Sequence, residues 1–267
     1  MTKTTKTPKN SIELSGSQFL YGQPEALHSE DHRDLKFVAQ EAPFAKAETV
    51  HIVPLLVGEF AQAMMHYPIV FGGPEKTPMA IMGLKEGQNM FVKNGRFENG
   101  AYVPAYLRRY PFTLAGAGEE QFVVCIDRDA PGFGEGEEGQ ALFEAGEPTD
   151  FTKNAIAFLN EFEVERKRTQ AFVEVLIEAD LFEVKHTLSV APSGEQELVA
   201  DYYGIAEEKL HALDNEQLGD LLKRGAVAMI DAHLLSLQRW NDLVARRTVE
   251  ASDIVLELNK EDELVAA

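Results

Sequence analysis

Two adjacent arginines, Arg108 and Arg109, stand in an aromatic stretch that also contains two prolines, Tyr102-Val-Pro-Ala-Tyr-Leu-Arg-Arg-Tyr-Pro-Phe112. A guanidinium group carries its donors in a planar fork, which suits a carboxylate, a phosphate or sugar hydroxyls. The chain around them has a formal net charge of -19, so cations are in the minority. The sequence therefore predicts that these two arginines contact a ligand or a partner.

Three tyrosines accompany the arginines. Tyr106 and Tyr110 are four residues apart, so both rings can lie on one side of a short helix and stack beside a ligand. Tyr102, which opens the stretch, is a third candidate contact. In the structural alternative, one arginine pairs with an internal acid such as Asp127, and the tyrosines lie in the core. The sequence leaves both interpretations open.

Two further pairs of residues could serve a site. Glu59 and His66 are seven residues apart in an expected helix, so they would share a face and could exchange a proton with a substrate. The alternative is an ion pair or cap at the helix ends. His233 and Trp240 flank the apolar stripe of the last helix, where the tryptophan could anchor a partner. Their structural alternative is a satisfied core histidine beside a packed tryptophan.

The usual catalytic motifs are not found in the sequence. His28 and His32 have the spacing of a helical metal pair, but their segment is polar and favours a solvated loop. Cys125, the single cysteine, lies in an apolar run typical of a buried, unreactive thiol. The glycine pattern at 134–139 contains three glutamates, which would repel a phosphate. We therefore predict no catalytic residue, no bound metal and no cofactor.

Composition limits the classes of partner. The chain has 267 residues with 44 acids against 25 bases, an excess that argues against binding to nucleic acid or to anionic membranes. Its hydrophobic content of 45% is typical of a globular protein. No apolar run approaches the roughly 18 residues of a membrane helix, and the basic N-terminal segment lacks the apolar part of a signal peptide. We expect a soluble cytoplasmic protein without membrane insertion.

Alternating and apolar runs predict a mainly antiparallel sheet from residues 49–127 and 181–204, and so an α+β fold class. A long central helix is expected at 151–179, followed by a hairpin of 181–190 with 197–203. Further strands are expected at 49–57, 69–71, 78–82, 90–92, 112–115 and 121–127, and further helices at 58–66, 105–110, 205–213, 215–223 and 225–247.

The expected domain organisation is simple. A single α+β domain spans residues 19–248, between a polar tail at 1–18 and an acidic tail at 249–267. Inside the domain, residues 128–150 are rich in glycine and acids and predict a long loop. Residues 205–247 form a helical C-terminal part.

Several short motifs, taken in order, resemble the SapC family of bacterial proteins, and the similarity runs from about residue 45 to 245. They are Glu59-Phe60, Tyr67-Pro-Ile-Val-Phe71, Asn89-x-Phe-Val92, Tyr102-x-Pro104, Arg108-Arg-Tyr-Pro-Phe112 and Gly225…Ile230-x-Ala-His233…Ser236-Leu237.

The resemblance implies a function only in outline. The family name derives from a surface-layer locus, and members also stand beside TonB-dependent receptors, flavin-dependent halogenases and cupin-like hydroxylases. This neighbourhood implies a role in nutrient uptake or in carbohydrate or peptide handling, and it brings no established catalytic residues. We expect an accessory or binding protein for an unknown protein partner or a small polar ligand. The alternatives are an iron-dependent oxygenase-type or other modifying enzyme, and a surface-layer component, although the chain shows no Sec-type signal.

Overall fold

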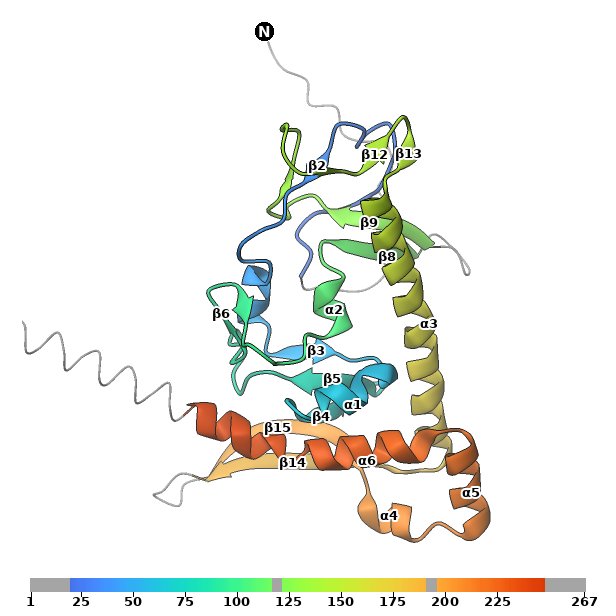
Figure 1. The fold of residues 1–267 in the computed structure, drawn as a ribbon. Helices are drawn as coiled ribbons and strands as arrows, with labels where there is room; N and C mark the ends of the chain where they lie inside the picture. The colour runs from blue at the N-terminus through green and yellow to red at the C-terminus, as the bar shows by residue number, and fades with distance from the viewer. Residues whose placement is uncertain (1–19, 117–121, 191–195, 248–267) are drawn as a thin grey trace, which may run out of the picture. The chain divides into compact units, whose positions relative to one another are not determined.

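The computed structural model describes residues 20–116, 122–190 and 196–247. These residues form two compact units, and the predicted single domain stays a prediction. The first unit contains the chain up to Glu41 and residues Arg109–Glu161; the second contains Ala42–Arg108 and the chain from Phe162. Helix α3 (Asp150–Glu178) begins in the first unit and ends in the second (Figure 1). Helices and antiparallel sheets occur together, so the predicted α+β class and the long central helix are confirmed.

A three-stranded antiparallel sheet forms the centre of the first unit. Its order is β1 (Pro24–Ala26), β9 (Phe122–Asp127) and β8 (Phe112–Gly116). Cys125 of β9 is fully buried, and burial raises the pKa of its thiol to about 11. A neutral, enclosed thiol is a poor nucleophile, as the apolar neighbours of this cysteine predict.

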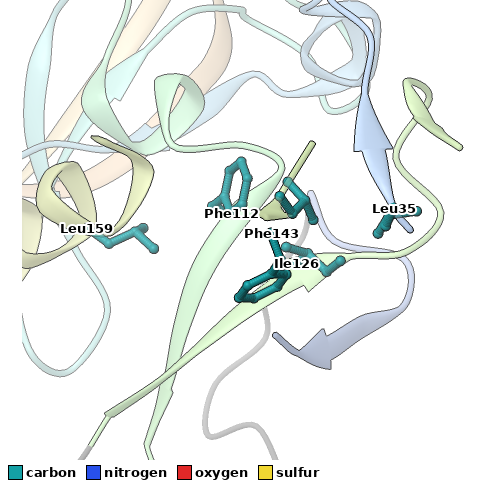
Figure 2. Close-up of a cluster of buried hydrophobic side chains, with 6 residues drawn as sticks. Leu35, Phe112, Ile126, Phe143 and Leu159 are labelled. Carbon is teal, nitrogen blue, oxygen red and sulfur yellow. The ribbon is translucent and has the colours of Figure 1, made fainter. Parts of the chain in front are cut away.

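The core of the first unit gathers side chains from segments far apart in the sequence. Phe112 and Ile126 of the sheet meet Leu159 of α3, and Leu35 joins them from the N-terminal segment (Figure 2). Removing such side chains from water is the main stabilising term in a unit of this size. The buried members are Leu35, Phe112, Ile126, Leu142, Phe143 and Leu159.

The segment 128–150 contains short strands, so the prediction of a continuous loop is wrong. Gly132 and Gly139 adopt φ angles of +114° and +103°, which side-chain-bearing residues rarely reach. A Cβ on Gly132 would also lie 2.6 Å from the carbonyl oxygen of Val38. These close approaches let β10 (Phe133–Gly134) and β11 (Gln140–Ala141) pair with either side of β2 (Lys36–Phe37), while β12 (Phe143–Glu144) pairs with β13 (Glu147–Pro148).

A five-stranded antiparallel sheet organises the second unit, and the predicted hairpin at 181–203 is confirmed in it (Figure 1). The strands within 112–127 were expected in this sheet, and that expectation is wrong because β8 pairs with β9, and β9 with β1, in the first unit. The strand order is β14 (Phe182–Val190), β15 (Gln196–Ile205), β4 (Ile69–Gly72), β5 (Thr77–Ile81) and β3 (Ile52–Pro54). A separate hairpin joins β6 (Val92–Lys93) to β7 (Arg96–Phe97).

Four of the predicted helices are shorter than expected or interrupted, and the differences are largest at 58–66 and 225–247. The expected helix at 58–66 is a 3-10 turn, η2 (Val57–Glu59), followed by the single-turn α1 (Phe60–Ala63). The expected helix at 225–247 is interrupted by a turn at 237–238. The remaining helices are η1 (Ala45–Thr49), α2 (Ala105–Arg108), α4 (Glu207–His211), α5 (Asn215–Lys223) and α6 (Ala226–Ser236), with helical residues at 239–247.

Helix α6 packs on α1, β4 and β15 of the same unit. None of the helices within the described residues is long and apolar enough to cross a membrane.

Candidate functional site

The arginine-tyrosine stretch is divided between the two units. Tyr102, Tyr106 and Arg108 belong to the second unit, whereas Arg109 and Tyr110 belong to the first. Each unit holds a buried carboxylate that accepts hydrogen bonds from two backbone N–H groups and from one tyrosine of this stretch. The two arrangements are therefore built in the same way.

Glu59 is the buried acceptor of the second unit, with 6% of its surface exposed. Its Oε2 accepts a hydrogen bond of 2.8 Å from the backbone N–H of Leu56, at the start of η2. Its Oε1 accepts bonds of 2.7 Å from the hydroxyl of Tyr102 and from the backbone N–H of Ala105, the first residue of α2. Donors to a charged group form strong hydrogen bonds, so Glu59 fixes both helix starts.

Tyr102 links this carboxylate to the rest of the second unit. Its backbone carbonyl accepts a hydrogen bond of 2.5 Å from the hydroxyl of Tyr67. Burial, together with the hydrogen bond to Glu59, raises the pKa of the Tyr102 hydroxyl to about 12. Burial also raises the pKa of Tyr67 above its ordinary range. Both phenols therefore stay protonated near neutral pH and act as hydrogen-bond donors.

Arg108 stands at the surface of the second unit, at the end of α2. Its Nε donates to the carbonyl of Val103 at 3.0 Å, and its Nη2 donates to the Tyr102 hydroxyl at 3.3 Å. The guanidinium carbon lies 5.9 Å from the centroid of the Tyr102 ring, within the range of a cation–π interaction. Arg108 is thus an oriented cation at the surface, whereas Tyr106 of the same helix is buried.

Asp127 is the corresponding acceptor of the first unit and is fully buried. Its Oδ1 accepts from the backbone N–H groups of Gly22 at 3.1 Å and Gln23 at 2.8 Å. Its Oδ2 accepts from the hydroxyl of Tyr110 at 3.0 Å. The Tyr110 ring packs against Tyr21, with ring centroids 5.5 Å apart. This carboxylate therefore ties the N-terminal segment to β9.

Arg109 lies beside the same aromatic pair. Its guanidinium carbon is 5.8 Å from the centroid of the Tyr21 ring, and the residue is half-buried. Arg109 therefore presents less of its surface than Arg108 does.

Glu59 and His66 do not share a helical face, so this part of the prediction is wrong. Glu59 precedes α1, which ends at Ala63, and His66 lies in the turn beyond. Burial lowers the pKa of His66, the positive charges of Arg239 and Arg246 lower it further, and Glu98 acts in the opposite direction.

His233 lies in the core of the second unit with no exposed surface. Its Nε2 accepts a hydrogen bond of 3.2 Å from the backbone N–H of Ile205, so the proton of the neutral ring is on Nδ1. That Nδ1–H donates to the carbonyl of Ile69 at 2.7 Å. Burial, opposed by this bond, lowers the pKa of His233 to about 4. The neutral imidazole joins α6 to β4 and β15, as its structural alternative predicts.

Trp240 is also enclosed, with 7% of its surface exposed. Its ring stacks on Tyr202 with centroids 5.9 Å apart and an interplanar angle of 29°. In this structure Trp240 is thus a packing residue of the second unit.

The histidine pair near the N-terminus is structural as well. His32 is buried, and its Nε2 lies 2.9 Å from Oε1 of Glu25, while its Nδ1 accepts from the backbone N–H of His28. The predicted solvated loop is therefore wrong for His32. In the part of the chain that the structure describes, no three His, Cys, Asp or Glu residues are grouped so that they could hold a metal ion.

One cluster, formed by Arg246, Glu98 and Phe91, was not predicted from the sequence. Arg246 pairs with Glu98 through Nη2 and Oε1 at 3.3 Å, and its guanidinium carbon lies 4.2 Å from the Phe91 ring centroid. The partners are about 150 positions apart in the chain, and no local pattern connects residues at such a separation.

Comparison with known families identifies the family of this chain. The family model described as SapC matches residues 27–243, which is most of the chain. The chain belongs to the SapC family. No curated protein and no solved structure was found to match it. The SapC match spans both units, because it includes β8 and β9 of the first unit as well as α6 of the second.

Proposed function

We propose that this SapC protein is a non-catalytic accessory or binding protein and that Arg108 contacts its partner or its small polar ligand. The observation that carries the proposal is the difference in exposure and hydrogen bonding among the candidate residues. Glu59, Tyr102, Tyr110 and His233 are committed to hydrogen bonds inside the units, whereas Arg108 is exposed and oriented. Bound in this way, Glu59 and His233 are poorly placed for proton transfer to a substrate.

The chemistry of Arg108 indicates the class of group that it recognises. Its guanidinium is held by Val103 and Tyr102, so less conformational entropy is lost when a ligand binds. Guanidinium forks prefer carboxylates and phosphates and also bind sugar hydroxyls. Arg109, beside Tyr21 in the first unit, is a second candidate contact.

The biological setting that we propose is TonB-dependent nutrient uptake or the handling of carbohydrates or peptides. This part rests on the neighbourhood known for the SapC family. Nothing in the described residues specifically favours the oxygenase-type enzyme or the surface-layer component, so we offer no second function.

Affinity measurements on single variants test the proposal. The partner captured by the wild-type protein is titrated against Arg108→Ala and Arg109→Ala, with Arg33→Ala as the control. Arg33 is an exposed arginine whose side chain is 72% accessible, so this control removes the same charge from the surface elsewhere. We expect Arg108→Ala to weaken binding about tenfold or more, as loss of a charged hydrogen-bond donor does. Equal affinities for Arg108→Ala and Arg33→Ala would remove the support for the proposal.

A further inference from the structure

Two adjoining hollows follow one face of α3 in the second unit. The larger, of about 310 Å³, lies between the last turns of α3 and α5. The smaller, of about 200 Å³, lies between the middle of α3 and the start of α6. Val175 and Arg224 line both hollows, so together they form one furrow, which we call the α3 groove. Figure 1 shows α5 beside the end of α3.

The floor of the α3 groove is apolar and contains small residues. Phe172, Val175 and Leu221 are buried and supply the floor. Ala171 lines the smaller hollow and Ala179 the larger, so a short side chain stands where each hollow opens. These alanines are eight residues apart, about 12 Å along a helix. The groove therefore has two apolar recesses. Their separation is close to that of two residues seven positions apart on a helix, which is about 10 Å along the helix axis.

The two ends of the groove differ in charge. Glu178, Glu216 and Asp220 line the larger hollow, where Arg224 bonds to Glu178 at 2.8 Å and to Asp220 at 3.4 Å. Three carboxylates against one guanidinium leave this end negative. Arg168 and Arg224 line the smaller hollow, where no acidic residue belongs to the lining, but Arg168 pairs with Glu165 at 3.4 Å and Arg224 is the residue shared with the larger hollow. An occupant should therefore carry basic groups at the end that lies in the larger hollow.

We propose that the α3 groove docks an amphipathic helix of a partner protein. Two apolar side chains of that helix, seven positions apart, fill the recesses beside Ala171 and Ala179. The helix carries lysine or arginine over Glu178 and Glu216. Its N-terminus, the positive end of its macrodipole, lies at the acidic end, so the helix runs antiparallel to α3. This surface is separate from Arg108 and goes beyond the function proposed above.

A pair of synthetic peptides tests the charge polarity. Both probes are fluorescein-labelled, alanine-based helices of about 18 residues, a length that supports helicity in water. Each has two leucines seven positions apart. The first probe has lysines in its first turn and glutamates in its last, and the second has these charges exchanged. Because the second sequence is the better isolated helix, tighter binding of the first is attributable to the groove. We expect an advantage of about tenfold in fluorescence anisotropy.

Substitutions in the full-length protein test the location. Ala179→Leu and Ala171→Leu each fill one recess and should weaken binding of the first probe about tenfold. Ala228→Leu, at an exposed position of α6 outside the lining, adds the same side chain and should leave the affinity unchanged. Glu216→Lys should also weaken binding, whereas Glu208→Lys, the same change in the first turn of α4, should not. Circular dichroism identifies any variant that fails to fold. If Ala179→Leu or Ala171→Leu fails to fold, the affinity of the other variant decides the test.

Three results would overturn the proposal. The first is no measurable binding of either probe by the folded wild-type protein. The second is equal binding of both probes, or binding that Ala179→Leu and Ala171→Leu leave intact. The third is a wild-type dimer that Ala179→Leu converts to a monomer, since the groove would then hold a second copy of the chain rather than a partner helix.

Discussion

The buried imidazole of His233 makes the stability of the second unit depend on pH in a calculable way. The pKa is about 4 in the folded protein against an ordinary value of 6.5, because burial disfavours the cation. Between these values the unfolded chain binds more protons than the folded chain. Stability is therefore fully present above the ordinary pKa, falls as the pH drops from about 6.5, and stops falling below about 4.

The magnitude follows from the two pKa values. Their difference of about 2.5 corresponds to a total loss of about 3 kcal/mol. Between pH 7 and pH 5, His233 alone should remove about 2 kcal/mol of unfolding free energy. This is a large part of the roughly 5–15 kcal/mol by which most proteins are stable.

A comparison of the wild-type protein with His233→Gln isolates this contribution. Glutamine does not titrate, and all other histidines remain in both proteins. At pH 7 the variant should be less stable by about 1–3 kcal/mol, since a bond to Ile205 or Ile69 becomes imperfect. At pH 5 the stability difference between the two proteins should be about 2 kcal/mol smaller, because only the wild type loses stability through this group.

Urea unfolding followed by tryptophan fluorescence measures this effect. Trp240 is the single tryptophan of the chain and is buried in the same unit as His233, so its emission reports this unit. If both proteins lose the same free energy between pH 7 and pH 5, His233 is not a neutral buried histidine in the folded state, and the reasoning is refuted.

Further predictions concern backbone fit and the Glu59 centre. Gly83→Ala should lower stability by about 3 kcal/mol or more, because its Cβ would lie 1.8 Å from the carbonyl oxygen of Gln88; an unchanged melting temperature would contradict this. Gly219→Ala, inside α5 with open space around it, should raise stability by about 0.5–1 kcal/mol, and a lowered urea midpoint would show that reasoning to be wrong. Glu59→Gln should cost about 1–3 kcal/mol in urea unfolding, since an amide nitrogen cannot accept from the donors that the carboxylate serves; full stability would argue against the three bonds.

Local elements were predictable from the sequence because their signals lie within a few residues. Helix α5 begins and ends as expected, since the Asp214 side chain accepts from the N–H groups of Glu216 and Gln217, and the Gln217 side chain accepts from the Asp214 N–H. The β14–β15 hairpin follows the alternation of its side chains. The long helix α3 follows the helical spacing of its apolar residues.

Long-range partners were not predictable in the same way. The sequence at 112–127 predicts one more hairpin of the large sheet, but β8 and β9 form a separate sheet in which β9 pairs with β1 near the N-terminus. The Glu59 carboxylate meets Tyr102 and Ala105 from another part of the chain, and nothing near Glu59 in sequence indicates this. Such pairings depend on tertiary packing, which single-sequence propensity does not contain.

For the candidate site too, the sequence was informative about residue types but not about burial or bonding partners. Residue type alone identified Arg108 as a potential contact and His233 as a potential core residue. Burial and hydrogen bonding, which separate the two roles, required the structure. Whether Arg108 contacts a partner remains the prediction on which the proposed function depends.

Native mass spectrometry of the protein isolated gently from its native host tests that central claim most directly. The wild-type protein, Arg108→Ala and Arg33→Ala are compared at equal expression. The account predicts that the wild type and Arg33→Ala carry the same bound protein or small polar molecule, and that Arg108→Ala carries at most about a tenth as much. A wild-type protein that is isolated bare, or an Arg108→Ala variant that keeps its full complement, would contradict the account.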